Sequence, residues 1–68
     1  MRIFRYTASD GSKVMFNLDA VSGITYDIVL KRLFFFWRGN ENYPAWIGDK
    51  TNDDGEKALM KLEEEEVW

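Results

Sequence analysis

The chain has 68 residues, no cysteine, no histidine and a formal net charge of −3. A chain of this length forms one domain, residues 1–68, near the lower limit for independent folding. The missing residue types exclude disulfides, thiolate or imidazole metal ligands and a histidine general base.

The charge is unevenly distributed along the chain. Residues 1–50 carry seven Lys or Arg and five Asp or Glu, whereas residues 51–68 carry two Lys and seven Asp or Glu. We therefore divide the domain into a β-rich body, 1–50, and an acidic C-terminal helix at about 53–66. The N-terminus lacks the apolar run of a signal peptide, and no stretch approaches the ~20 apolar residues that span a bilayer. We expect a soluble, cytoplasmic protein that does not bind membranes.

The first predicted element is a β-hairpin in residues 2–18. An Asp-Gly pair, Asp10 and Gly11, separates the β-prone runs MRIFRYTA and KVMFNL, and glycine accepts the positive φ of a tight hairpin turn. Alternation gives each strand one apolar row: Phe4 and Tyr6 on the first, then Val14, Phe16 and Leu18 on the second. The chain bends at 19–20 and a third strand begins near Val21.

The spacing DG..V.FNLDAVSGI, followed by strands and an acidic helix, resembles that of the flagellar FlbD-like family of small sheet-plus-helix proteins. The resemblance implies a sheet with a helix. It implies no site residue and no activity.

Residues 24–39, ITYDIVLKRLFFFWRG, fit two patterns. With a period of two, one strand carries Ile24, Tyr26, Ile28 and Leu30 on one face, and a later strand covers Leu33–Trp37. With a helical period of about 3.6, a stripe forms from Tyr26, Val29, Leu30, Leu33 and Trp37. The β-branched and aromatic content favours strands, and a short helix stays open.

The rest of the chain predicts a turn, a strand and a helix. RGNEN is the turn, and in the strand YPAWIG the proline Pro44 is compatible with an edge or a strand start. Asp53 or Asp54 can cap a helix with the apolar stripe Ala58, Leu59 and Leu62. The fold class is α+β: a small antiparallel sheet of four to five strands, open or curled toward a barrel, with one C-terminal helix packed on it. The expected core contains Phe4, Phe16, Ile24, Leu59 and Leu62.

The run RLFFFWR is more aromatic than a strand with one covered face requires. Alternation separates Phe34 and Phe36 from Phe35 and Trp37, and one helix covers one face of a sheet. We predict Phe34 and Phe36 in the core and the other row at an interface, unless the sheet curls and covers both. The predicted partner-binding residues of the body are Arg32, Phe35, Trp37, Arg38, Tyr43 and Trp46.

The acidic end is the second candidate contact. Glu63, Glu64, Glu65 and Glu66 repel one another and oppose the dipole at a helix C-terminus. Two explanations stay open: a solvated helix end that aids solubility, or an acidic patch that meets a basic partner surface or imitates nucleic-acid phosphate.

No catalytic residue, cofactor or metal is predicted. The segment DKTNDDGE resembles a calcium loop, but aligning its glycine with the EF-hand pattern puts Lys50 and Lys61 at the two terminal ligand positions. The serines lie in turn-like contexts, where hydroxyls commonly bond the backbone.

We therefore predict a small non-catalytic protein–protein interaction module, such as a phage or prophage accessory protein or an inhibitor of a host factor. The same aromatic row would also suit a homodimer. The alternative is a single-stranded nucleic-acid-binding module that combines aromatic stacking with the cations Lys31, Arg32 and Arg38. The small positive excess of the body favours the protein partner.

Overall fold

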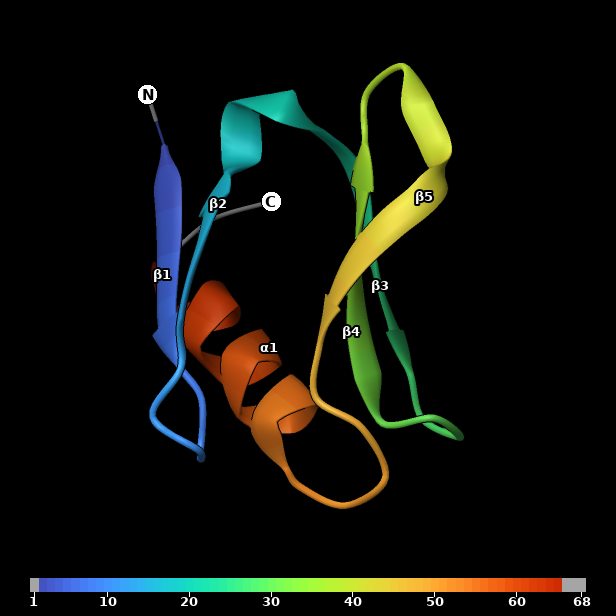
Figure 1. Cartoon of the computed structure of the whole chain (residues 1–68). Helices are drawn as coiled ribbons and strands as arrows, with labels where there is room; N and C mark the ends of the chain where they lie inside the picture. The colour runs from blue at the N-terminus through green and yellow to red at the C-terminus, as the bar shows by residue number, and fades with distance from the viewer. Residues whose placement is uncertain (1, 66–68) are drawn as a thin grey trace.

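The computed structural model describes residues 2–65, which form five antiparallel strands in two sheets and one C-terminal helix. Strands β1 (Ile3–Thr7) and β2 (Lys13–Asn17) form the first sheet. The second sheet has the order β3 (Val21–Asp27), β4 (Arg32–Trp37) and β5 (Asn40–Ile47). A short 3-10 helix, Leu18–Ala20, links the sheets, and α1 (Asp54–Glu65) lies between the hairpin and the second sheet (Figure 1).

The α+β class is confirmed, whereas the single sheet of four to five strands is wrong. The strands divide between two sheets, which do not close into a barrel in the described part of the chain. The division occurs at the 3-10 helix, where the side chain of Asn17 accepts a 3.0 Å hydrogen bond from the Asp19 amide. This turn ends β2 and carries the chain from one layer to the other.

The predicted hairpin is confirmed. Gly11 has a φ of 92°, and the Ser12 amide donates to the Asp10 carboxylate at 2.9 Å within the turn. Phe4 pairs with Phe16, and Tyr6 pairs with Val14. Paired residues share a face, so these four side chains form the inner surface of the hairpin.

Residues 24–39 form two strands joined by a turn, and the helical alternative is wrong. The predicted first strand was too long, because Ile28 and Leu30 belong to the turn and not to β3. The Asp27 carboxylate accepts hydrogen bonds from the Val29 and Leu30 amides, which bend the chain there. Ile28 and Val29 are consequently 79% and 71% exposed at the tip of the β3–β4 hairpin.

The core lies between the two sheets and α1. Its largest fully buried side chains are Phe4, Leu18, Leu33, Phe35 and Leu62. Of the expected core, Phe4 and Leu62 are buried, while Phe16, Ile24 and Leu59 are half-buried and pack against it.

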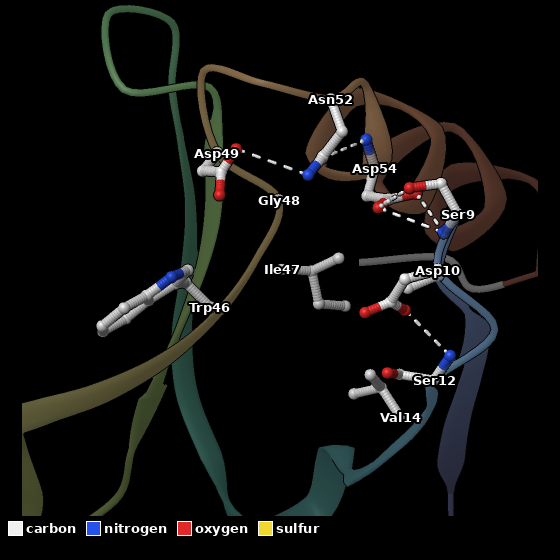
Figure 2. A pocket seen from close by; sticks show the side chains of 11 residues that line it. Ser9, Asp10, Ser12, Val14, Trp46, Ile47, Gly48, Asp49, Asn52 and Asp54 are labelled. Atoms are coloured by element: carbon white, nitrogen blue, oxygen red, sulfur yellow. Dashed lines mark hydrogen bonds between the residues drawn. The ribbon is translucent and has the colours of Figure 1, made fainter.

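Asp54 fastens the start of α1 to the hairpin. Its buried carboxylate accepts hydrogen bonds from Tyr6 Oη at 2.8 Å, Ser9 Oγ at 2.8 Å and the Ser9 amide at 3.0 Å. Figure 2 shows Ser9 reaching Asp54 from the hairpin turn. The capping position itself is Asp53, whose carbonyl accepts from the Lys57 amide at 2.9 Å. The sequence therefore located the helix start, but the Asp54 side chain serves a long-range contact.

Candidate functional site

The face of the second sheet that points away from the core carries an aromatic cluster. Phe34 lies between Thr25 on β3 and Trp46 on β5, its paired residues in the two neighbouring strands. Alternation along β4 adds Arg32 and Phe36 to this side and places Leu33 and Phe35 on the core side. We call Arg32, Phe34, Phe36 and Trp46 the outer aromatic face.

The members of the outer aromatic face contact one another. The ring centroid of Phe34 is 5.9 Å from that of Trp46 and 6.2 Å from that of Phe36. The Arg32 guanidinium lies over the Trp46 ring, 4.7 Å from its centroid. These separations are typical of favourable aromatic and cation–π contacts, so the four side chains form one continuous surface.

This surface is accessible to solvent and separate from the core. Trp46 is 50% exposed, and Phe34 and Phe36 are half-buried by their neighbours on the sheet. None of these three belongs to the buried core or to the side chains packed against it. The hairpin and α1 both contact the opposite side of β4, so neither covers the outer aromatic face within residues 2–65.

The predicted assignment of the two aromatic rows is therefore wrong, and the rows are exchanged. Phe35 is 0% exposed, with its ring 4.4 Å from that of Phe16. Trp37 is half-buried and packs edge-on against Phe16 at 5.5 Å. The reason lies in which residues share each side of β4. Phe35 is on the same side as the apolar Leu33, whereas Phe34 and Phe36 are on the same side as Arg32. A cation without a paired charge is costly to bury, so the row with Arg32 faces solvent.

This alternation was visible in the sequence and could have identified Phe34 and Phe36, the two residues of the outer aromatic face that the prediction missed. Phe34 and Phe36 are two and four residues from Arg32, which puts all three on one side of a strand. The location of Trp46 beside them was not visible, since it depends on the register between β4 and β5.

The other predicted contact residues are not among the four side chains that contact one another on the outer aromatic face. Arg38 Nη1 donates to the Asp19 carbonyl at 3.2 Å, which ties the β4–β5 turn to the link between the sheets. Tyr43 is 74% exposed. It lies between Asn40 and Ala45, where the register of β5 against β4 shifts. Of the acidic run, residues 63–65 are exposed in the last turn of α1, and Glu66 lies outside the described residues. Only Arg32 and Trp46 of the predicted set lie on the outer aromatic face.

Arg32 is flanked by two carboxylates that already accept other hydrogen bonds. Asp27 accepts from the turn amides of Val29 and Leu30, and Asp49 accepts from the Thr51 hydroxyl and amide. The hydrogen bonds from Thr51, with a smaller contribution from the charge of Arg32, lower the pKa of Asp49. Arg32 Nε is buried and has no hydrogen-bond partner within the described chain. The Arg32 guanidinium therefore contributes mainly its flat face and its positive charge to the outer aromatic face.

A concave site of about 290 Å³ lies between the β1–β2 turn and the end of β5 (Figure 2). Three carboxylates line it, but each already accepts hydrogen bonds: Asp10 from Ser12, Asp49 from Thr51 and Asp54 from Ser9 and Tyr6. Among residues 2–65 no group of three or more metal-binding side chains is arranged to hold an ion. These carboxylates order the local loops.

The described helix is also too short and too polar to cross a bilayer. Comparisons of the chain with protein-family models, curated proteins and solved structures find no significant match.

Proposed function

We propose that this chain is a small non-catalytic protein–protein interaction module that binds its partner through the outer aromatic face. One observation carries the proposal: Phe34, Phe36 and Trp46 form a continuous aromatic surface on the side of the sheet opposite the core. Aromatic residues and arginine dominate the binding energy of protein interfaces, and this face consists of both.

The outer aromatic face, with three rings and one guanidinium, favours a partner of mixed apolar and polar character. Removing apolar surface from water contributes about 25 cal/mol per Å², and the rings are already packed side by side on a rigid sheet. A partner therefore orders few side chains when it binds, which limits the entropic cost of association. The Arg32 guanidinium at the end of the face provides one charge that can select the partner.

Single-stranded nucleic acid is less well supported. Arg32 is the cation of this face, while Lys31 Nζ lies 3.8 Å from the Asp53 carboxylate and Arg38 bonds the Asp19 carbonyl. Nucleic-acid binders neutralise several phosphates at once, and a single cation does not suffice for that. An accessory protein or inhibitor of a host factor, of the phage or prophage type, fits a module that acts by covering a partner surface.

The test is capture of protein partners by immobilised wild type and by two serine variants. Phe36→Ser removes a ring from the outer aromatic face, and Met15→Ser is the matched control, an exposed apolar side chain on β2. We expect wild type and Met15→Ser to retain the same proteins and Phe36→Ser to lose them, with unchanged circular dichroism for all three. Retention of the same proteins by Phe36→Ser would overturn the proposal. Binding of a labelled oligo-dT that disappears as salt rises would support the nucleic-acid alternative instead.

A further inference from the structure

We propose that an acidic, extended segment of a partner protein pairs with the outer edge of β1, and that Arg5, Lys13 and Lys61 select its charge. This edge belongs to the two-stranded sheet, whereas the outer aromatic face belongs to the other sheet. The contact is therefore a second one, in addition to the proposed function. Within residues 2–65 no strand pairs with this edge, and Figure 1 shows β1 on the side of the hairpin away from the second sheet. An edge of this kind is a template for strand addition.

The hydrogen bonds of the hairpin show which backbone groups this edge presents. The Leu18 amide donates to the Arg2 carbonyl, in register with the pairing of β1 and β2. Along an antiparallel pair, residues that exchange hydrogen bonds alternate with residues that do not. The residues of β1 that turn their N–H and C=O groups away from β2 are therefore Ile3, Arg5 and Thr7.

A side chain already occupies one of these outward groups. Lys61 Nζ of α1 donates to the Arg5 carbonyl, where a neighbouring strand would supply an amide. The ammonium also lies 3.8 Å from the Glu65 carboxylate, but both side chains are partly exposed and such pairs are weak. Because lysine has a flexible stem and three donors, an incoming amide can replace it on the carbonyl. Its charge then remains available for a carboxylate of the partner.

A groove of about 400 Å³ beside this edge carries positive charge. Arg5 and Lys13 line it from the two strands of the hairpin, Lys61 lines it from α1, and none of its lining residues is acidic. Arg5 and Lys13 are exposed and form no ion pair within the described part of the chain. Met15, which is 66% exposed, adds apolar surface to the groove. Carboxylates are the groups that complement these three cations.

The edges of the second sheet do not suit an acidic segment. Its two end strands are β3 and β5. β3 contains Asp27, β5 contains Glu41, and neither strand contains Lys or Arg. Like charges on neighbouring strands repel, and Pro44 in β5 has no amide to donate. Charge therefore directs an acidic segment to β1.

The outward groups of β1 also favour a peptide over a nucleic acid. An added peptide strand both donates to and accepts from the edge that it joins. Phosphate oxygens only accept, so the outward carbonyls of Ile3 and Thr7 would gain no partner from a phosphate chain.

The experiment is a fluorescence anisotropy titration of a labelled peptide of four Thr-Glu repeats with the whole chain. The chain is added up to ~1 mM, in ~0.1 M salt. We expect saturable binding that is at least about tenfold tighter than that of four Thr-Lys repeats. Arg5→Glu and Lys13→Glu should each weaken it at least about fivefold, with unchanged circular dichroism. The matched control is Lys50→Glu, the same charge change at an exposed position between β5 and α1, and it should bind within about twofold of wild type.

Amide hydrogen exchange tests the backbone pairing itself. The Arg5 and Thr7 amides should exchange at least about tenfold more slowly when the Thr-Glu peptide is bound. The Asn17 amide is the control, because it points outward from the opposite edge of the hairpin and should not change.

Four results would overturn the proposal. They are absence of saturable binding at ~1 mM, equal binding of the Thr-Lys peptide, wild-type affinity in both Arg5→Glu and Lys13→Glu, and bound peptide without slower exchange at Arg5 and Thr7. Tighter binding of oligo-dT than of the Thr-Glu peptide would overturn it in favour of nucleic acid. The assay does not involve the outer aromatic face, so each of these results leaves the proposed function in place.

Discussion

The hydroxyl of Tyr6 donates a 2.8 Å hydrogen bond to the carboxylate of Asp54, and this contact joins residues 48 positions apart. It connects β1 to the start of α1, two elements that also meet through the apolar core and through the hydrogen bond that Lys61 Nζ donates to the Arg5 carbonyl. Both groups are buried, and Ser9 supplies the remaining donors to the carboxylate. A buried carboxylate is costly unless hydrogen bonds satisfy it, so the hairpin turn and the helix start depend on each other.

The first prediction concerns this carboxylate. Asp54→Asn keeps the shape of the side chain but weakens charge-assisted hydrogen bonds, and should lower the free energy of unfolding by about 1.5–3 kcal/mol. That loss is large for a chain of 68 residues, whose total stability is on the order of 3–10 kcal/mol. Chemical denaturation followed by circular dichroism measures it. Asp53→Asn is the matched control next in sequence; its carboxylate is 62% exposed beside Lys31, and its loss should change stability little. Equal losses for the two variants would contradict this account.

The second prediction is a loss of stability at high pH. Burial, the hydrogen bond to Asp54 and the charge of Asp54 raise the pKa of Tyr6 from 10.0 to about 12. Because the folded-state pKa is raised, the stabilisation is complete below pH 10 and is lost as pH rises from 10 toward 12. A two-unit shift corresponds to about 3 kcal/mol. Denaturation midpoints measured across this pH range should fall steeply for wild type and remain nearly flat for Tyr6→Phe.

The third prediction is a loss of stability at low pH. Burial alone would raise the pKa of Asp54, but the hydrogen bonds from Ser9 and Tyr6 outweigh it and hold the pKa below its usual 3.8. The stabilisation is therefore complete above pH 3.8 and is lost as pH falls through the lower folded-state value. The carboxyls of Asp10, Asp19, Glu41 and Asp49 also have lowered pKa values and contribute to the same transition. Acid denaturation of Asp54→Asn beside wild type isolates the contribution of Asp54, and identical acid profiles would refute it.

The fourth prediction contrasts two neighbouring phenylalanines. Phe35 is fully buried between Phe4 and Phe16, and Phe35→Ala should cost ~3–5 kcal/mol and leave the chain largely unfolded. Phe36→Ser should leave the fold intact, because this ring lies outside the core. Thermal unfolding of both variants by circular dichroism decides the matter. Two unfolded variants would mean that β4 is covered on both faces.

Local patterns in the sequence were sufficient to predict the hairpin and the helix, but not how the strands are arranged in sheets. Asp10-Gly11 and the flanking alternation identify the hairpin, and the apolar stripe of Ala58, Leu59 and Leu62 identifies α1. The division into two sheets depends on the turn after Asn17, whose geometry no local period reveals.

The site was predictable only in part, for a similar reason. The sequence alone shows that Arg32, Phe34 and Phe36 lie on the same side of a strand. The contact of Trp46 with Phe34, however, depends on the register between β4 and β5. The contacts of Asp54 join distant residues, and the sequence placed that residue correctly at the helix start without indicating its partners.

The last prediction concerns a crossing of three backbone segments at Gly48. A Cβ on Gly48 would lie 2.3 Å from the Gly55 amide nitrogen and 2.9 Å from the Lys31 carbonyl oxygen. Its φ of +91° is also unfavourable for any residue with a Cβ, at a cost of roughly 1–2 kcal/mol. All of the contacting atoms belong to the backbone, so no side-chain rotation can relieve them.

Gly48→Ala should therefore destabilise the chain by more than its backbone conformation alone explains. The matched control is Gly39→Ala. Gly39 has a φ of +82°, but no atom lies within 4 Å of the added Cβ. This variant should therefore lose only the roughly 1–2 kcal/mol that the positive φ costs a residue with a Cβ. Denaturant midpoints of the two variants, measured side by side, separate the conformational cost from the close approach. We expect Gly39→Ala to fold and Gly48→Ala to be mostly unfolded. The added Cβ on Gly48 would prevent the end of β5 from lying as close to the start of α1 as the fold requires. Equal midpoints would show that the three segments can move apart without loss of the fold.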